Sequence, residues 1–321
     1  MQKIRVGVVR GGPSSEYDVS LRTGESVIRG LSTDLYTPLD ILLTKEGEWF
    51  VNGTPTDLGT IATKVDIIWN ALHGEFGEDG KLQKQLEDFG IPYTGSNSLS
   101  SAIGMHKGLA KKRFSEMGML TPKGVVIEPD EVAFYQDGNI GLALPFPLIV
   151  KPITGGSSVA TCIVHDGAEL YQALLAASVY GDVLVEEVIL GTEATVCVLD
   201  GNLTGTQYAL FPIEIVPPPS NVFFNYDAKY SGVSLEICPG RFTLDTHSKL
   251  RDLAITAHNA IGARHYSRTD FIISSDGIYA LEINTLPGLT AESLVPKALR
   301  ATGMAFPQFL EHVIGLAMRT H

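Results

Sequence analysis

The chain has 321 residues, 44% of them hydrophobic and 19% charged, which is typical of a soluble globular protein with two or three packed units. Its formal net charge of −12 argues against nucleic acid or an anionic membrane as the main partner, because both attract basic surfaces. Cys162, Cys197 and Cys238 are too few and too scattered for a disulfide framework or a zinc site, so a reducing cytosol is expected. No apolar run has the length expected of a signal peptide or a membrane span.

The first hundred residues alternate between strand and helix patterns. Apolar runs predict strands at residues 4–12, 36–44, 65–74 and 91–96, and amphipathic patterns predict helices at residues 16–31 and 79–90. This rhythm is typical of βαβ units. It predicts an open α/β sheet for residues 1–100.

The rest of the chain has an α+β pattern. One helix is predicted at residues 99–118, followed by two strands around the glycine-rich turn "ITGGSSVA", a helix near residues 168–178 and the strand "VLVEEVILG". Further strands, helices near residues 244–262 and at the end of the chain, and a hairpin at residues 269–288 follow. The long segment "VPPPSNVFFNYDAKYSG" interrupts them, and its aromatic residues argue for a functional loop rather than plain disorder.

The hairpin "TDFIISSDGIYALEINTLPG" carries three oxygen donors. A three-residue turn ending at a left-handed Gly277 would place Asp270 opposite Glu282, with Asn284 on the same face, whereas a two-residue turn would separate the two carboxylates. A divalent cation would relieve the repulsion between them, and oxygen ligands without His or Cys favour Mg²⁺ or Mn²⁺. A charged face that is merely solvated explains the hairpin equally well.

Two further segments are compatible with nucleotide binding. Lys151 ends an apolar strand just before Gly155 and Gly156, and such a turn can present backbone N–H groups to phosphate, although an ordinary hairpin beside a lysine has the same pattern. The acidic residues of "LVEEVILGTE" can accept hydrogen bonds from an adenine or a ribose, but a solvated strand end is the simpler explanation of that segment alone. The chain has neither a P-loop motif nor the glycine fingerprint of a dinucleotide-binding fold, which disfavours a dehydrogenase.

Taken together, the motifs resemble those of the D-alanine–D-alanine ligase family of the ATP-grasp superfamily. The resemblance runs in order along nearly the whole chain, through "GGPSSEYDVSL", "ALHGEFGEDG", "YTGS", "MHKGLAKKRF", "PLIVKPITGGSSVA", "LVEEVILGTE", "YDAKY", "SRTDF" and "LEINTLPGLTAESLVP". It implies a three-domain ATP-grasp ligase of α/β and α+β class. An N-terminal open α/β substrate domain would span residues 1–100, a central ATP-grasp subdomain residues 101–187, and a C-terminal subdomain with the metal ligands and a lid loop residues 188–321.

The resemblance also implies an activity. ATP would phosphorylate one D-alanine, and the amine of a second would attack the acyl phosphate to give D-alanyl-D-alanine for peptidoglycan synthesis. The cofactors implied are ATP and Mg²⁺ or Mn²⁺, in a cytoplasmic homodimer without nucleic-acid or membrane partners. The alternatives are an ATP-grasp ligase for other amino or hydroxy acids, and a non-catalytic nucleotide-binding protein on the same fold.

The resemblance assigns roles to individual residues. It implies metal ligation by Asp270, Glu282 and Asn284. The implied nucleotide contacts are Lys107, Lys151, Glu186, Glu187 and Glu193. The implied substrate-binding residues are Glu16, His73, Lys229, Ser293 and Leu294, and the implied catalytic residues are Glu16, Ser157, Tyr230, Arg268 and Gly288. Ser157 and Tyr230 would be linked through Glu16, and Tyr230 favours an amine acceptor over a hydroxy acid.

Three positions depart from the family pattern. His106 stands where the family usually has aspartate, which bears on the start of that helix rather than on Lys107. Ala160 replaces a usual glycine, and its Cβ is expected to stiffen or shift the turn. Asp18 replaces a more common glutamate, which is a mild change.

Overall fold

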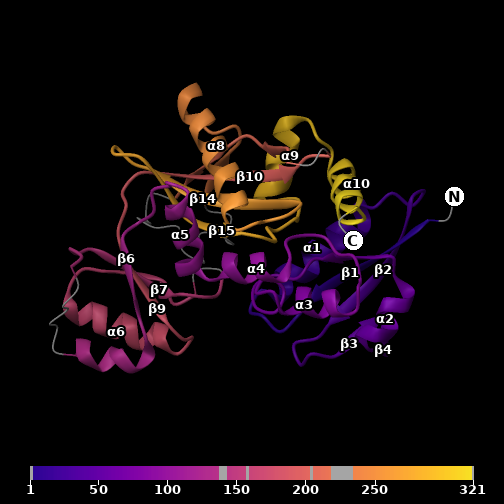
Figure 1. Cartoon of the computed structure of the whole chain (residues 1–321), viewed down its shortest axis with the longest axis horizontal. Helices are drawn as coiled ribbons and strands as arrows, with labels where there is room; N and C mark the ends of the chain where they lie inside the picture. Colours follow the sequence, from indigo (N-terminus) through magenta and orange to yellow (C-terminus); the bar gives the residue numbers. More distant parts are fainter. Residues whose placement is uncertain (1–2, 137–142, 157–158, 203–204, 218–233, 320–321) are drawn as a thin grey trace.

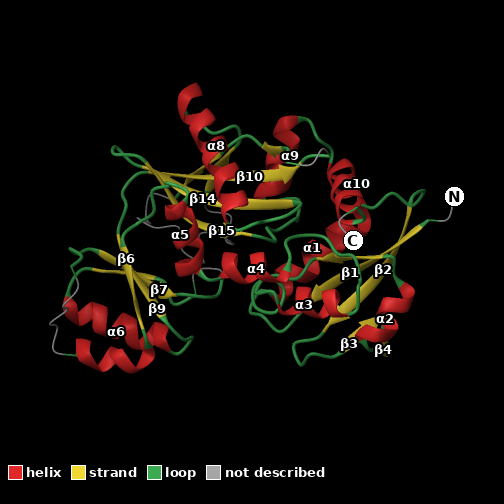
Figure 2. Cartoon of the chain, viewed as in Figure 1, coloured by secondary structure: helices red, strands yellow, loops and turns green. Residues whose placement is uncertain are grey.

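The computed structural model describes residues 3–136, 143–156, 159–202, 205–217 and 234–319. Three sheets organise this part of the chain, and each lies within one of the ranges 1–100, 101–187 and 188–321 (Figures 1 and 2). This distribution supports those three ranges as the domain division that we propose. None of the described helices combines the length and apolar character that crossing a bilayer requires.

The N-terminal sheet has the strand order β4-β3-β2-β1-β5, with β1 parallel to both β2 and β5. Val6, Val8 and Val9 of β1 are completely buried, as expected for a parallel strand covered on both faces. The segment at residues 91–96, predicted as a strand, makes a single bridge between Ile68 and Tyr93. The elements are β1 (Ile4–Gly11), α1 (Tyr17–Gly30), β2 (Tyr36–Leu43), β3 (Trp49–Val51), β4 (Thr54–Thr56), α2 (Leu58–Lys64), β5 (Ile67–Asn70) and α3 (Lys81–Asp88).

The central sheet is antiparallel, in the order β6-β9-β7-β8, and packs against α6. Asp166 caps α6 by accepting hydrogen bonds from the backbone N–H groups of Ala168 and Glu169, which explains why the helix begins there. The elements of this unit are β6 (Gly124–Ile127), the 3₁₀ helix η1 (Pro129–Tyr135), β7 (Leu148–Pro152), β8 (Cys162–Val164), α6 (Gly167–Ser178) and β9 (Val183–Glu187).

The predicted helix at residues 99–118 is two helices, α4 (Ser98–Met105) and α5 (Lys107–Glu116), separated by His106. His106 has an extended backbone, and its Nδ1 accepts a hydrogen bond from the N–H of Leu109, so it caps α5. Ala110 and Phe114 of α5 are buried in the core of the C-terminal sheet. The apolar periodicity continues across the break, which is why the sequence pattern reads as a single helix.

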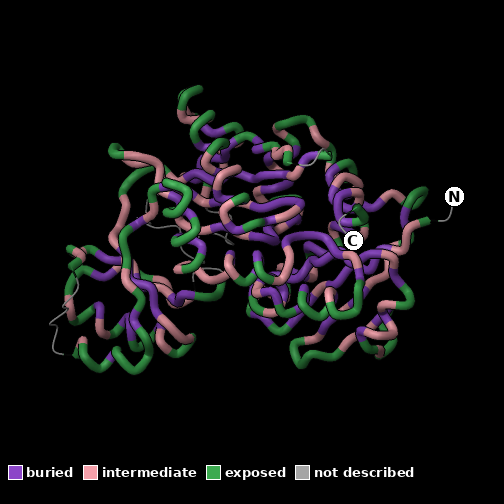
Figure 3. The backbone as a smooth tube through the Cα atoms, viewed as in Figure 1, coloured by how far each residue is buried: buried purple, intermediate pink, exposed green. Residues whose placement is uncertain are grey.

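The C-terminal sheet is antiparallel, in the order β13-β12-β10-β14-β15, with β11 also paired to β10. Its central strand β10 is buried on both faces. Val196 and Val198 pack with α5 and α8, whereas Cys197 and Leu199 pack with α9 and α10. Buried backbone runs through all three units (Figure 3). The elements are β10 (Thr192–Asp200), β11 (Gln207–Ala209), β12 (Ile213–Val216), β13 (Leu235–Ile237), α8 (Leu244–Ala260), β14 (Tyr266–Ile273), β15 (Ile278–Asn284), α9 (Leu294–Thr302) and α10 (Phe306–Ala317).

A shared aromatic core joins the N-terminal and C-terminal sheets. Trp69 of β5 stacks on Tyr266 of β14 with 6.4 Å between ring centroids, and Phe309 of α10 packs edge-on against both rings. All three side chains are buried, so α10 lies against the N-terminal unit although it ends the chain (Figure 1). Aromatic clusters of this kind bury large apolar areas, so this contact holds the two units in a fixed arrangement.

The β14–β15 hairpin corrects one sequence prediction and confirms another. The turn is one residue shorter than predicted: Ile273 pairs with Ile278 and the Ser274 N–H donates to the Gly277 carbonyl at 2.9 Å, so only two residues lie between Ser274 and Gly277. Gly277, with a φ of 157°, is not in the left-handed helical conformation. A β-bulge then shifts the register by one residue, so Asp270 still lies opposite Glu282. The predicted pairing is therefore right, but a bulge at residue 281 produces it rather than the turn.

Candidate active site

A cavity of about 1250 Å³ opens between the three units. It is lined by α1 and nearby loops of the N-terminal unit and by strands of the central and C-terminal sheets. The cavity is lined by fourteen of the predicted site residues: Glu16, His73, Lys107, Lys151, Glu186, Glu187, Glu193, Arg268, Asp270, Glu282, Asn284, Gly288, Ser293 and Leu294. Ser157, Lys229 and Tyr230 lie outside the described residues. A cavity of this size is large enough for a nucleotide together with small substrates.

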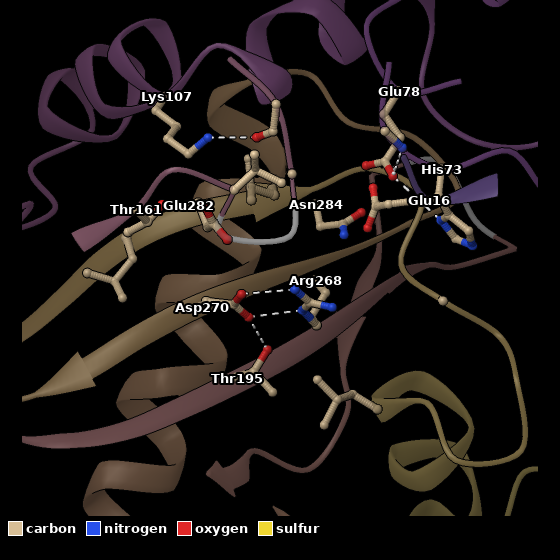
Figure 4. Close-up of a pocket in the computed structure, with 18 of the residues that line it drawn as sticks. Glu16, His73, Glu78, Lys107, Thr161, Thr195, Arg268, Asp270, Glu282 and Asn284 are labelled. Atoms are coloured by element: carbon tan, nitrogen blue, oxygen red, sulfur yellow. Dashed lines mark hydrogen bonds and ion pairs between the residues drawn. The ribbon is translucent and has the colours of Figure 1, made fainter. Parts of the chain in front are cut away.

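One wall of the cavity carries the three predicted metal ligands (Figure 4). In the β14–β15 ladder Asp270 pairs with Glu282 and Arg268 pairs with Asn284, so all four residues lie on one face. Arg268 donates to Asp270 through Nε and Nη2, each at 2.9 Å. Burial acts to lower the pKa of Arg268, but the Asp270 carboxylate outweighs it and the pKa is raised. Arg268 therefore carries a fixed positive charge here.

The donor set on this wall fits a hard divalent cation. Asp270 accepts hydrogen bonds at both carboxylate oxygens, yet each oxygen has two lone pairs and can also ligate a metal. Asn284 accepts a hydrogen bond from the Leu286 N–H at 2.9 Å, which fixes the orientation of its amide oxygen. The two facing carboxylates carry two negative charges, and the single positive charge of Arg268 neutralises only one of them. Oxygen donors of this kind favour Mg²⁺ or Mn²⁺.

Glu186 forms a buried charge cluster at the end of β9. Its side chain lies between two lysines: Lys151 on β7, with Nζ 2.6 Å from Oε2, and Lys111 on α5, in close contact with Oε1. The pKa of Lys111 is lowered, mainly by burial and to a smaller extent by the positive charge of Lys151. The cluster ties α5 to the central sheet across the cavity floor. Lys111 was not among the predicted site residues, although its position one helical turn after Lys107 places both lysines on the same face of α5.

The glycine-rich turn approaches the N-terminal unit. Lys107 donates to the carbonyl of Gly155 at 2.7 Å, which holds the turn from the α5 side. A Cβ on Gly156 would lie 3.0 Å from Glu16 Oε2, so a larger residue here would require the Glu16 carboxylate to shift. Ala160 has a φ of 51°, a left-handed conformation that glycine adopts without strain. The glycine that is usual at this position therefore has a physical explanation.

Acidic and imidazole groups gather beside Glu16. His73 is buried, and its Nδ1 lies 3.5 Å from Glu78 Oε1 (Figure 4). Its Nε2 lies 2.8 Å from the hydroxyl of Thr23. Burial acts to lower the pKa of His73, but Glu78 and Glu16 outweigh it and raise it, while burial raises the pKa of Glu78. Glu78 was not among the predicted site residues, although it stands in the motif H-G-x-x-G-E-D-G that begins at His73.

The opposite end of the cavity is formed by the start of α9. Ser293 is the N-cap residue, Leu294 is the first helical residue, and the Ser293 hydroxyl interacts with the backbone N–H and the hydroxyl of Thr290. A Cβ on Gly288 would lie 2.9 Å from Ser293 Oγ, so the loop before α9 is tightly packed. Exposed N–H groups at a helix start favour an anion such as a carboxylate.

Two protein-family models match the chain. The family description "D-ala D-ala ligase C-terminus" matches residues 114–315, and "D-ala D-ala ligase N-terminus" matches residues 5–61 and 52–96. The chain belongs to the D-alanine–D-alanine ligase family. The family and the ATP-grasp fold expected from the sequence motifs are therefore confirmed.

Individual relatives of the family agree over the full length. The chain is 41% identical to a D-alanine–D-alanine ligase of Anaeromyxobacter sp. (strain K), over 98% of this chain and 97% of the relative. Among solved structures, the VanG D-Ala:D-Ser ligase of Enterococcus faecalis has a TM-score of 0.86 at 31% identity, covering 98% of this chain and 100% of that one. The ATP complex of a Bacillus anthracis D-alanine–D-alanine ligase has a TM-score of 0.79 at 31% identity, covering 99% and 98%.

Proposed function

We propose that this protein joins two D-alanine molecules into D-alanyl-D-alanine for peptidoglycan synthesis, converting ATP to ADP and phosphate. One observation carries the proposal: a single cavity collects the oxygen donors of the hairpin, two lysines beside a glycine-rich turn, and the carboxylate and imidazole of Glu16 and His73. The curated relatives at this level of identity bear the same activity in their names.

Phosphoryl transfer is the first step, because a free carboxylate is a poor electrophile. Lys107 and Lys151 would bind the ATP phosphates, and Glu186 and Glu193 the adenine and ribose, with Glu187 beside them. Mg²⁺ or Mn²⁺ held by Asp270, Glu282 and Asn284 would neutralise phosphate charge. Arg268 would stabilise the negative charge on the transferring group, and the fixed charge of its guanidinium suits that role.

The first D-alanine would bind beside Glu16. Its ammonium group would be attracted by the carboxylates of Glu16 and Glu78, because two acidic side chains and a desolvated cavity favour a cation. His73, held between Glu78 and Thr23, would orient this subsite. This arrangement leaves the substrate carboxylate directed toward Arg268 and the ATP phosphates.

The second D-alanine would bind at the start of α9, with its carboxylate at Ser293 and Leu294 and its amine directed toward the acyl phosphate. Attack by the amine gives a tetrahedral intermediate, and the Arg268 guanidinium and the Gly288 N–H would stabilise its oxyanion. Collapse of the intermediate releases phosphate and the dipeptide. The roles of Ser157, Lys229 and Tyr230 in this scheme stay predictions from the sequence.

A phosphate-release assay tests the proposal. The purified protein is incubated with ATP, Mg²⁺ and D-alanine, and the dipeptide is identified by mass spectrometry. We expect one phosphate per dipeptide, and no release with L-alanine or without amino acid. Phosphate release that does not depend on D-alanine, or no release at all, would refute the proposed activity.

A second candidate is a ligase that joins D-alanine to D-serine. Its support is the fold similarity to the VanG D-Ala:D-Ser ligase, together with the polar ion pair between Lys297 and Glu236, 2.5 Å apart at the acceptor end of the cavity. Equal concentrations of D-alanine and D-serine in one assay separate the candidates. We expect D-alanyl-D-alanine to dominate, since the curated relatives are named for that product.

We also infer that the enzyme acts in the cytoplasm as a homodimer. Family resemblance supports both statements, and the requirement for ATP favours the compartment in which ATP is made. Light scattering on the eluate of a size-exclusion column distinguishes a dimer from a monomer. Fractionation of cells, followed by assay of the ligase activity, tests the location.

A further inference from the structure

Thr195 of β10 lies directly opposite Asp270 of β14 in the antiparallel ladder. It lines the cavity and is 2% exposed. Its hydroxyl donates to Asp270 Oδ1 at 2.5 Å (Figure 4). The carbonyl oxygen of Thr269 is 3.2 Å from the same hydroxyl. Asp270 is therefore held from two strands, by Arg268 on its own strand and by Thr195 on the neighbouring one.

We infer that Thr195 is a positioning residue for the metal site: its hydroxyl fixes the Asp270 carboxylate in the orientation that ligates the cation. This inference rests on the proposed function, which places a divalent cation at Asp270. Arg268 alone would not hold the Asp270 carboxylate in this orientation, because its guanidinium also interacts with the transferring phosphoryl group in the proposed mechanism. A donor from a second, rigid strand keeps the carboxylate in place while Arg268 changes partners.

The hydroxyl of Thr195 can support Asp270 in both the free and the metal-bound state. It has one proton and two acceptors within reach, and the charge-assisted bond to Asp270 is the shorter of the two. When a cation ligates Asp270, Oδ1 can still accept the hydrogen bond from Thr195, because each carboxylate oxygen has two lone pairs. No buried donor is then left unsatisfied, which would otherwise cost free energy. A serine can act in the same way, whereas a valine cannot.

Thr269 offers a matched control for this role. It is fully buried in β14, adjacent to Asp270, and its hydroxyl has no hydrogen-bond partner within the described part of the chain. Changing Thr269 to valine removes the same atoms at a neighbouring buried position. It does not remove any hydrogen bond to the Asp270 side chain.

Mn²⁺ binding tests the inference independently of turnover. The full chain is saturated with ADP and titrated with Mn²⁺, and free Mn²⁺ is followed by electron paramagnetic resonance. We expect Thr195→Val to raise the Mn²⁺ dissociation constant about tenfold, the loss typical when an outer-shell partner of a metal ligand is removed. Thr195→Ser and Thr269→Val should stay within about twofold of the wild type, since both keep the hydrogen bond to Asp270.

Unchanged Mn²⁺ affinity in Thr195→Val, or equal weakening in Thr269→Val, would overturn the positioning role. Circular dichroism shows whether each variant folds, and Thr195→Ala replaces Thr195→Val if the valine does not fit. The phosphate-release assay on the wild type separates the two proposals. A wild type that turns over while Thr195→Val keeps its affinity overturns only the role of Thr195, whereas a wild type without turnover overturns the ligase function.

Discussion

His106 begins α5 by accepting a hydrogen bond at Nδ1 from the backbone N–H of Leu109, 3.2 Å away. The imidazole thus caps the helix in place of the aspartate that is usual in the family, and Lys107 is the first helical residue. The departure from the family pattern changes the chemistry of the cap but keeps its function. This explains how the chain tolerates histidine beside a lysine proposed to bind phosphate.

Replacing His106 by aspartate should therefore stabilise the protein. A carboxylate is a better cap acceptor and also interacts favourably with the helix dipole, which together contribute ~0.5–1 kcal/mol to the free energy of unfolding. His106→Ala removes the cap and should cost ~1 kcal/mol. Urea unfolding of both variants against the wild type measures the difference. A stability of His106→Ala equal to that of the wild type would show that the cap contributes nothing.

Ala160 adopts a φ of 51°, so its Cβ is held in a conformation that costs an L-residue ~1–2 kcal/mol. Ala160→Gly removes this strain but adds backbone entropy to the unfolded chain, which offsets part of the gain. We expect a net stabilisation of up to ~1 kcal/mol, measured as a rise in the thermal midpoint. Ala160→Val is the opposite control and should lower the midpoint, because a β-branched residue is strained further at positive φ.

The sequence predicted the cavity-lining residues better than the local geometry that positions them. Motifs with chemical meaning, such as the oxygen donors of the hairpin, identify side chains directly. In contrast, the bulge at residue 281 lies close to a parallel bridge between Leu120 and Tyr279, which joins segments distant in sequence. No local pattern encodes such a contact, so the turn length was predicted wrongly.

The sequence patterns also failed to predict site residues that act through a neighbouring side chain. Thr195 and Lys111 stand in an apolar strand and an ordinary charged helix, and neither pattern distinguishes them from packing or solvated residues. Their roles follow only from tertiary neighbours, Asp270 for the threonine and Glu186 for the lysine. The β-hairpin at Trp49–Val51 and Thr54–Thr56 was missed as well, because each strand has only three residues and little periodicity.

Glu282 should be essential for turnover and dispensable for folding. Its side chain is only half-buried on the cavity wall, so Glu282→Gln should leave the thermal midpoint within a few degrees of the wild type. Loss of one metal-ligating charge should lower kcat at least about a hundredfold, since electrostatic stabilisation of the transferring group is lost. Glu292→Gln is the matched control, because Glu292 also lines the cavity but is exposed. Near-normal turnover of Glu282→Gln would show that the charge of Glu282 is not required at the metal site.

Lys111 should affect nucleotide affinity through Glu186. Lys111→Met keeps the length of the side chain but removes its ammonium, and Glu186 then keeps its ion pair with Lys151. We expect KM for ATP to rise about tenfold, with a loss of stability of ~1–3 kcal/mol from the broken buried ion pair. The neighbouring Lys112 is exposed, so Lys112→Met should change neither quantity. An unchanged KM in a folded Lys111→Met variant would mean that Glu186 does not depend on this partner.

Asp200 gives the fold a pH dependence at the end of β10. Its carboxylate lies 3.2 Å from His258 Nε2 and accepts a hydrogen bond from the His265 N–H at 2.5 Å. Burial acts to raise the pKa of Asp200, but these interactions outweigh it and hold the pKa below its usual 3.8. The carboxylate therefore stabilises the folded state above pH 3.8, and this contribution is lost as the pH falls through the lower, folded-state value.

Asp200→Asn should consequently be most destabilising at neutral pH, where we expect a cost of about 2 kcal/mol. The difference from the wild type should shrink at pH values below 3.8, because protonation then removes the same charge from the wild-type protein. Urea unfolding at pH 7, compared with a series in acid, measures the trend. Asp252 is exposed on α8, so Asp252→Asn should be neutral throughout the series. A cost of Asp200→Asn that stays constant into strong acid would mean that the side chain acts through shape rather than charge.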